Sequence, residues 1–392
     1  MFINREKVGV VFLLFFPIYS FSAEITLVSL NELMNFSKDI EYIKCHEKEF
    51  FQYKKFPLSV YPEYQPNTGL FAETFVIKIP GGSVCSHFGF VLVDNKVIRE
   101  LLSQNFSIDR YWSLLKKIDI GHRVPKRIFG RVAVLTRIGT DVYGHWLVDV
   151  LGRLEILRKQ NIEYDWLYVP YDQPYMRETL ALLGVDFSKV ITPYDDNFYI
   201  QADELIVPSL TIRRIKASNE LHFCPYHPCT FYCAAWNIFF LRNSFLPRAK
   251  ELLFEKPFPK KVFISRKDAS TRKMLNEDQI FALFEPMGFV RVLMSQLTFL
   301  EQVALFQNAQ IVVAAHGSCL TNLVFCNQGT KVIEIFQNQF DSGFWQLSDQ
   351  LQLQHYCLKT QEDMVDCSFK IDTIVPIEMV QDFIQNYPDV FY

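Results

Sequence analysis

The sequence predicts an α/β protein with two Rossmann-like domains, the first beginning with a region of mixed strands and helices. A chain of 392 residues exceeds the size at which one hydrophobic core usually stops growing, so two domains are expected. From residue 131 onward, short apolar runs alternate with helical stretches, the pattern of parallel strands joined by helical crossovers. Pro257 and Pro259 interrupt this pattern, and we place the domains at 24–257 and 258–392.

The first 23 residues have the anatomy of a secretory signal peptide. Basic residues precede an apolar run at 8–16, Pro17 ends the run, and Ser20 and Ser22 stand at a suitable cleavage spacing. The run is short for a bilayer span, so we expect an exported or secretory-pathway protein, with an uncleaved membrane anchor as one alternative. A buried N-terminal strand or helix is the other alternative.

The composition and net charge of the chain limit the kinds of binding partner that are expected. Hydrophobic residues make up 49% of the chain and charged residues 21%, which is typical of a globular protein. A net charge of -3 provides no polycationic surface, so no nucleic-acid partner is expected. Three of the nine cysteines crowd with two histidines into 222–233. Their spacing matches no standard zinc pattern, and a disulfide or buried thiols are expected there rather than a metal.

The elements of the N-terminal domain follow from its apolar runs. Strands are expected at 75–79, 88–98, 131–138, 165–170, 189–194 and 202–209, and helices at about 145–159 and 175–184. The aromatic, proline-punctuated segment from 212 to 258 is typical of a helical connection between domains.

The C-terminal domain alternates more sharply. Strands are expected at 261–266, 289–294, 310–315 and 331–336, and helices at 276–288, 298–309, 318–325 and, as a tail, 374–387. Asn276 and Gly288 are the expected start and stop of the first helix, and Thr298 with Glu301 forms a capping box at the second.

Ligands of open α/β sheets bind beyond the carboxyl ends of the strands, where the loop at 265–273 carries four cations. Arg266 and Arg272 in this loop suit a diphosphate, because arginine binds phosphate bidentately. A solvated charged loop is the alternative interpretation.

The second candidate loop is His316-Gly317-Ser318, between a buried strand and a short helix that also carries Thr321 and Asn322. Gly317 lets the backbone approach a ligand, the helix start presents free N–H groups to an anion, and His316 adds a donor. A purely structural role for His316 is an equal alternative.

Glu334 lies within the apolar strand at 331–336, where a carboxylate is costly to bury unless it is paired. A ribose diol and a buried ion pair are equally good partners for it. In the N-terminal domain, His145 and Asp149 are four residues apart and would share one face of a helix after a strand. Either could deprotonate an acceptor hydroxyl, or Asp149 could simply balance Arg153 while His145 caps the helix.

Together these motifs resemble glycosyltransferase family 61, over about residues 130 to 340. The family pattern is an Arg-rich loop, Asn-Glu, Glu-Gln, His-Gly with a following Thr-Asn, and a Glu in the last strand. The matching residues are Arg266, Arg272, Asn276, Glu277, Glu301, Gln302, His316, Gly317, Thr321, Asn322 and Glu334. The second family signature, Gly-His-Trp with an Asp four residues after the His, is similar to 144–154. Gly152 stands where the family usually has Pro, and Ser318-Cys319 where it usually has Ala-Gly.

The resemblance implies the GT-B fold, in which two Rossmann-like domains face a cleft. It also implies inverting transfer from a nucleotide sugar, often UDP-linked, to a glycan or protein acceptor without a metal or other cofactor. Arg266, Arg272 and the amides at Gly317 and Ser318 would then neutralise the departing diphosphate. His316, Thr321, Asn322 and Glu334 would help to hold the phosphate or ribose. Asp149 would be the first candidate base and His145 the second.

Three other functions stay open. They are a GT-B-like polysaccharide pyruvyl transferase, a carbohydrate-binding or scaffold protein with a decayed transferase site, and a retaining transferase. A donor screen separates the first two from a glycosyltransferase, and the stereochemistry of the product separates the third.

Overall fold

The computed structural model describes residues 25–54, 68–102, 108–118, 123–212, 233–337, 342–360 and 372–391. The segment predicted to be a signal peptide, 1–23, and the cysteine-rich segment 222–233, except for Cys233, lie outside these ranges. Within them, no helix combines the length and the apolar character needed to cross a bilayer.

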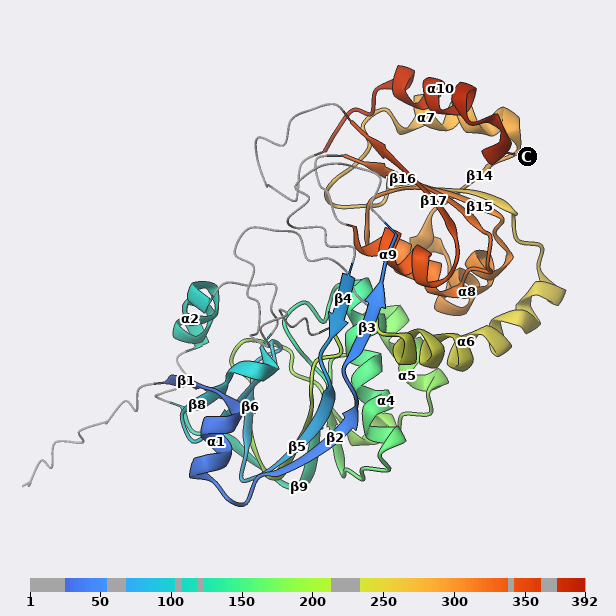
Figure 1. Ribbon diagram of the computed structural model, residues 1–392. Helices are drawn as coiled ribbons and strands as arrows, with labels where there is room; N and C mark the ends of the chain where they lie inside the picture. Colours follow the sequence, from blue (N-terminus) through green and yellow to red (C-terminus); the bar gives the residue numbers. More distant parts are fainter. Residues whose placement is uncertain are drawn as a thin grey trace, which may run out of the picture.

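A mixed ten-stranded sheet forms the first half of the described chain, in the lower part of Figure 1. β9 (Lys126–Val134), β10 (Trp166–Tyr168) and β11 (Val190–Ile191) run parallel, and β12 (Tyr199–Pro208) lies parallel to β9 on its other side. The expected parallel rhythm after residue 131 is therefore confirmed. β12 also pairs antiparallel with β5 (Thr74–Pro80) and β6 (Ser83–Cys85). The remaining strands of this sheet are β1 (Thr26–Val28), β2 (Glu41–His46), β7 (Phe90–Val93) and β8 (Lys96–Ile98).

Two predicted strands of this half differ from the structure. The single strand expected at 88–98 is the hairpin β7–β8, because Asp94 takes a left-handed φ of 52° and turns the chain. The strand expected at 189–194 is reduced to β11, since Pro193 cannot donate to a ladder. A separate two-stranded ribbon, β3 (Glu49–Gln52) with β4 (Thr68–Phe71), extends toward the second half (Figure 1).

The helix expected at about 145–159 is present, but it contains a change of pitch. α3 (Tyr143–His145) continues through a π-helical turn at Trp146–Val150 into α4 (Leu151–Lys159). The π-helical turn lies directly after His145 and includes Asp149, so the spacing of four residues spans a wider turn than the α-helical one expected. The other helices of this half are α1 (Leu30–Phe36), α2 (Ile108–Ile118) and α5 (Pro174–Leu182).

The second half is built on a five-stranded sheet whose strand pairs are all parallel. In sheet order its strands are β14 (Val290–Val292), β13 (Lys261–Ile264), β15 (Ile311–Ala315), β16 (Lys331–Phe336) and β17 (Gln354–Lys359). Its helices are α7 (Glu277–Phe284), α8 (Phe299–Asn308), the 3-10 helix η8 (Ser318–Phe325), α9 (Gly343–Gln350) and α10 (Ile377–Asn386).

Three of the predicted helix signals of this half can be checked. Gly288 takes a left-handed φ of 84° and ends the helical stretch, as expected. The capping box of Thr298 and Glu301 is present at α8. Asn276 stands before α7, but its side chain makes no cap; it bonds to the backbone of Val375 instead. Asn276 therefore fastens the C-terminal segment to the second half.

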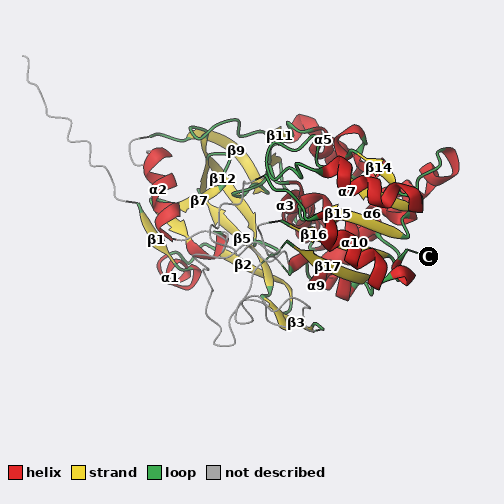
Figure 2. Ribbon diagram, turned by 90° about the horizontal axis from the view of Figure 1, so that it is seen from above, coloured by secondary structure: helices red, strands yellow, loops and turns green. Residues whose placement is uncertain are grey.

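The two halves are joined by packed helices and capping contacts. α6 (Ala235–Glu255) packs against both α8 and η8, and one continuous apolar core includes residues of α4, α6, α8 and η8. The Glu178 carboxylate of α5 accepts the N–H groups of Phe299 and Leu300 at 2.7 and 2.9 Å, which caps α8 from the first half. Figure 2 shows the strand-rich first half beside the helix-rich second half.

Candidate functional site

Two loops meet at the carboxyl edge of the five-stranded sheet. The chain's strand order reverses between β13 and β15, and ligands of open α/β sheets bind outside such a switch point. The loop at 265–273 follows β13, and His316-Gly317-Ser318 follows β15. The two predicted ligand loops therefore begin side by side, on adjacent parallel strands.

The first loop is held by the side chains of Arg266 and Glu277. Nε of Arg266 donates to the carbonyl of Arg272 at 2.9 Å, and Nη2 donates to the carbonyl of Thr271 at 2.9 Å. The buried Glu277 carboxylate accepts the backbone N–H of Arg266 at 2.7 Å and the hydroxyl of Ser265 at 2.5 Å. These contacts fix where the Arg266 guanidinium lies.

The second arginine of the loop lies close to the first. Arg272 adopts a left-handed φ of 56°, a conformation that costs energy for any residue except glycine. Burial and then the Arg266 cation lower the pKa of Arg272. Two neighbouring guanidinium groups repel each other, and an anion beside them relieves that repulsion. The pair therefore suits a diphosphate.

Gly317 allows the second loop to lie directly on this arginine. Its φ of 175° is ordinary extended backbone, so conformation alone does not require glycine. Space does, because a Cβ at this position would lie 2.4 Å from Nη1 of Arg266. Ser318 and Cys319, both partly exposed, then begin η8. Burial raises the pKa of the Cys319 thiol, and the cations of Arg266 and Arg272 oppose that increase.

His316 and Glu334 form a buried pair beside the turn. Nδ1 of His316 lies 2.6 Å from Oε1 of Glu334, and Oε2 of Glu334 lies 3.0 Å from Nε2 of His355. Burial acts to raise the pKa of Glu334, but the hydrogen bonds and charges of the two histidines lower it below its usual value. Both carboxylate oxygens are occupied and the side chain is 0% exposed. The expected contact of Glu334 with a ribose is therefore corrected: Glu334 orients His316.

Thr321 and Asn322 are buried residues of η8 that support the site. Both residues are 0% exposed. Oδ1 of Asn322 accepts the Tyr143 hydroxyl at 2.7 Å, and Nδ2 of Asn322 donates to Oε1 of Gln302 at 3.2 Å. Direct contact of these two side chains with phosphate or ribose does not fit this burial. Asn322 instead ties η8 to α3 and α8.

Asp149 has a different environment from the one expected for a base. It is 0% exposed, and its Oδ2 makes a 2.9 Å ion pair with Nε of Arg137. Its Oδ1 accepts the backbone N–H and the hydroxyl of Thr211 at 2.9 and 3.2 Å. Arg153 binds the carbonyls of Leu135, Thr136 and Pro208 and makes no ion pair with Asp149. A carboxylate enclosed in this way cannot reach an acceptor hydroxyl, so the preference for Asp149 over His145 is reversed.

His145 is the better placed proton acceptor. Its ring packs on Gly139, where an added Cβ would lie 3.3 Å from Cδ2. Burial and then the Arg137 cation lower the pKa of His145 well below its ordinary value, so the imidazole is neutral near pH 7. Its Nδ1 is buried and has no hydrogen-bond partner in the described ranges. The ring is therefore in the neutral state that a general base needs, and because Nδ1 is buried, Nε2 is the nitrogen left to accept a proton.

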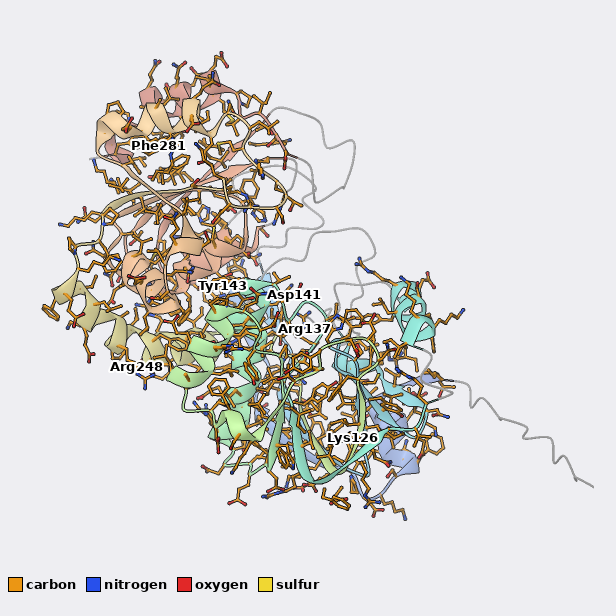
Figure 3. The ribbon with its side chains drawn as sticks, turned by 180° about the vertical axis from the view of Figure 1, so that it is seen from behind. Lys126, Arg137, Asp141, Tyr143, Arg248 and Phe281 are labelled. Atoms are coloured by element: carbon orange, nitrogen blue, oxygen red, sulfur yellow. The ribbon has the colours of Figure 1, made fainter. Side chains whose placement is uncertain are left out.

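The fold brings the two sequence motifs together although they are far apart in the chain. Tyr143 and Asn322, which share a hydrogen bond of 2.7 Å, are 179 positions apart. Figure 3 shows Arg137, Asp141 and Tyr143 where the two halves meet, and Lys126 in the first half far from that junction. The candidate base and the arginine pair therefore belong to elements that meet at the junction.

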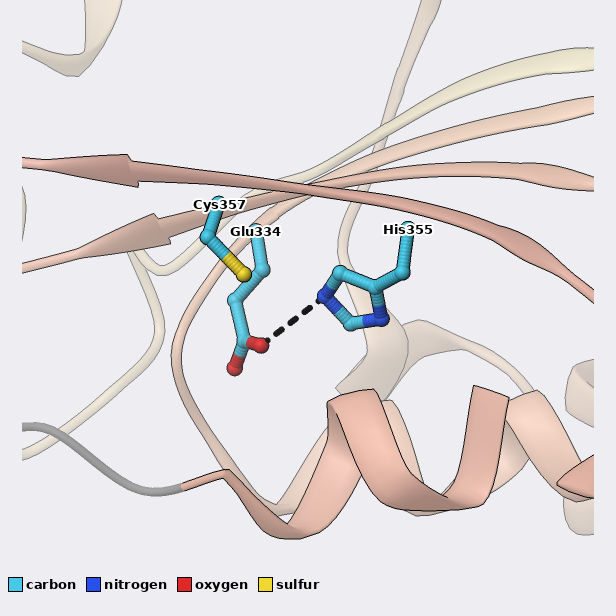
Figure 4. A group of neighbouring side chains, drawn as sticks. All are labelled: Glu334, His355 and Cys357. Atoms are coloured by element: carbon cyan, nitrogen blue, oxygen red, sulfur yellow. Dashed lines mark hydrogen bonds and ion pairs between the residues drawn. The ribbon is translucent and has the colours of Figure 1, made fainter. Parts of the chain in front are cut away.

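One group of described residues has the ligand types of a metal site. The ligand atoms of Glu334, His355 and Cys357 lie within 4.8 Å of one another (Figure 4). The Glu334 carboxylate is already bonded to two imidazoles, so these residues act as a hydrogen-bonded network here. The six cysteines of the described ranges are free thiols.

Arg137, Thr211 and His355 were not recognised from the sequence as parts of the site. Arg137 lay within a predicted strand, Thr211 between a predicted strand and the predicted connection, and His355 in a strand that was not predicted. For the last of these, the available signal was the short apolar run Tyr356-Cys357-Leu358.

Comparison with known protein families identifies one match. The model of the glycosyltransferase 61 family matches residues 143–333, a range that includes every predicted site residue except Glu334. No curated protein sequence matches the chain.

Proposed function

Residues 143–333 belong to the glycosyltransferase 61 family, and on this premise we propose that the chain transfers a sugar from a nucleotide-sugar donor to a hydroxyl of a glycan or protein. The donor is expected to be UDP-linked and the transfer inverting. The observation that carries the proposal is the arginine pair against the Gly317 turn, at the switch point of a parallel sheet.

The donor site uses this pair to stabilise the leaving group. When the bond between sugar and diphosphate breaks, negative charge builds on the phosphate oxygens. Arg266 and Arg272 offer cations, the amides that begin η8 offer N–H donors, and His316 offers its Nε2. Glu334 and Asn322 position these groups from buried sites instead of touching the donor.

The acceptor hydroxyl is deprotonated by His145 in this proposal. A neutral imidazole accepts the proton while the oxygen attacks the anomeric carbon from the side opposite to the diphosphate, which inverts the configuration. Asp149 contributes indirectly, because it holds Arg137 beside the ring.

Three finer features belong to the same proposal. The two halves form a GT-B arrangement, which two units of sheet and helix packed together through α4, α6, α8 and η8 support. No metal takes part, because the cations at the site carry the required charge. The protein is exported or enters the secretory pathway through its first 23 residues, whose composition supports a signal sequence.

A donor screen tests the function. Purified protein is incubated with nucleotide sugars and candidate glycan acceptors in EDTA, and products are identified by mass spectrometry and anomeric NMR. We expect one sugar to be transferred with inversion, and His145→Gln to lower kcat by about a hundredfold or more. Transfer of pyruvate, retention of configuration, or full activity of His145→Gln would contradict the proposal.

A further inference from the structure

Glu334, His355 and Ser348 form a hydrogen-bonded network next to His316, on the face of the sheet covered by α9. In the parallel register of β16 and β17, Glu334 stands opposite Cys357, and His355 lies two residues before Cys357. Side chains two residues apart point to the same face of a strand. Figure 4 shows Glu334, His355 and Cys357 all leaving the sheet on one side. Ser348 of α9 then reaches this face, with its hydroxyl 2.7 Å from Nδ1 of His355.

The hydrogen bonds of the network have one consistent direction. An ionised carboxylate only accepts hydrogen bonds, so Nδ1 of His316 and Nε2 of His355 must both donate to Glu334. If His355 is neutral, its Nδ1 is an acceptor and takes the Ser348 hydroxyl proton. The chain of donors therefore runs from Ser348 through His355 to Glu334. Because Nδ1 of His316 is bonded to Glu334, its other ring nitrogen, Nε2, takes no part in this network.

Each oxygen of the Glu334 carboxylate needs its hydrogen-bond donor. Glu334 is 0% exposed, so no water replaces a missing partner at low cost. The ring of His316 is flanked by Phe336 and Phe344, whose ring centroids both lie 5.3 Å away and offer no alternative acceptor for Nδ1. The carboxylate plane, and with it the orientation of His316, thus depends on the bond from His355.

We propose that His355, held by Ser348, is a positioning residue that acts through Glu334 to keep Nε2 of His316 directed at the ligand. His355 and Ser348 lie beyond the segment that matches the family model. Only the identity of the ligand rests on the proposed function.

The first test needs no substrate. In protein labelled with ¹⁵N-histidine, the ring nitrogens of His316 are assigned by loss of signal in His316→Gln, and its tautomer is read from their shifts. We expect protonated Nδ1 in the wild type, a changed Nδ1 signal in His355→Leu, and recovery in His355→Gln, whose amide can donate to Glu334. Ser348→Ala should give a smaller change in the same direction. His46→Leu, which alters a histidine stacked on Trp236, is the matched control and should leave His316 unchanged.

The second test uses turnover. With the donor found in the screen, His355→Leu should lower kcat by about a hundredfold while the acceptor KM stays within about twofold, because the ligand-contacting groups remain but His316 is misplaced. An unchanged His316 signal in folded His355→Leu or Ser348→Ala overturns the proposal. So does stoichiometric zinc that is lost in His355→Leu, since His355 and Glu334 would then be metal ligands. Failure to find any donor would refute the proposed function but leave the NMR result decisive.

Discussion

Replacing Gly317 by alanine should weaken nucleotide binding more than it weakens the fold. The new Cβ would lie 2.4 Å from Nη1 of Arg266, whereas ordinary contacts begin at 3.4 Å, so the guanidinium must move by about 1 Å. Two hydrogen bonds of 2.9 Å to the carbonyls of Thr271 and Arg272 oppose that movement. A hydrogen bond from the displaced guanidinium to a phosphate contributes about 1.5–3 kcal/mol to binding. A loss of about 1.4 kcal/mol weakens binding tenfold. We therefore expect UDP to bind about tenfold to a hundredfold more weakly.

Isothermal titration with UDP in EDTA measures the affinity, and urea unfolding measures the stability of the same samples. Gly329→Ala is the control, because Gly329 has a φ of 82° but no atom within 4 Å of an added Cβ. It should lose about 1–2 kcal/mol of stability through backbone strain and bind UDP normally. Wild-type affinity in Gly317→Ala would refute the assignment of Arg266 to the phosphate.

Three further predictions concern stability, each measured by urea unfolding. The pKa of His145 is lowered in the folded state, so the unfolded chain binds a proton at this imidazole more readily than the folded chain does. The free energy of unfolding should therefore decrease as pH falls below about 6.5, by about 1.4 kcal/mol per pH unit. His145→Gln should remove this one-proton contribution, and equal slopes in both proteins would count against it. Tyr143→Phe leaves Oδ1 of Asn322 buried without its donor and should cost about 1–3 kcal/mol. Tyr175→Phe, which removes an exposed hydrogen bond, should cost less, and equal losses would contradict the argument. Gly152→Ala places a Cβ 2.9 Å from both Asn237 and Thr211 and should cost about 1–3 kcal/mol; a variant as stable as wild type would refute this.

Much of the second sheet could be predicted from its sequence because local pattern and burial agree there. β13, β15 and β16 are continuous apolar runs, as buried parallel strands should be, and the loops that follow them carry the expected arginines and glycine. β17 escaped prediction because its apolar run is only Tyr356-Cys357-Leu358, preceded by the polar Gln354 and His355.

The roles of individual site residues could not be predicted, because they depend on partners distant in the sequence. Asp149 is enclosed by Arg137 and by Thr211, 62 positions away, and no local spacing indicates this. Glu334 had two equal interpretations, and the second histidine on β17 decides between them. The change of pitch after His145 likewise arises from packing, since residues 146–150 are all buried.

The central claim is that a nucleotide-sugar diphosphate binds the arginine pair at the edge of the second sheet. A thermal-shift panel of nucleotides and nucleotide sugars in EDTA tests it most directly, with wild type, Arg272→Gln and the surface control Arg127→Gln. A ligand that binds only the folded state at a hundred times its Kd adds about 2.7 kcal/mol of stability. We predict a shift with UDP or a UDP-sugar that Arg127→Gln retains and Arg272→Gln loses. No shift with any nucleotide in well-folded wild-type protein, or an undiminished shift in Arg272→Gln, would contradict the account.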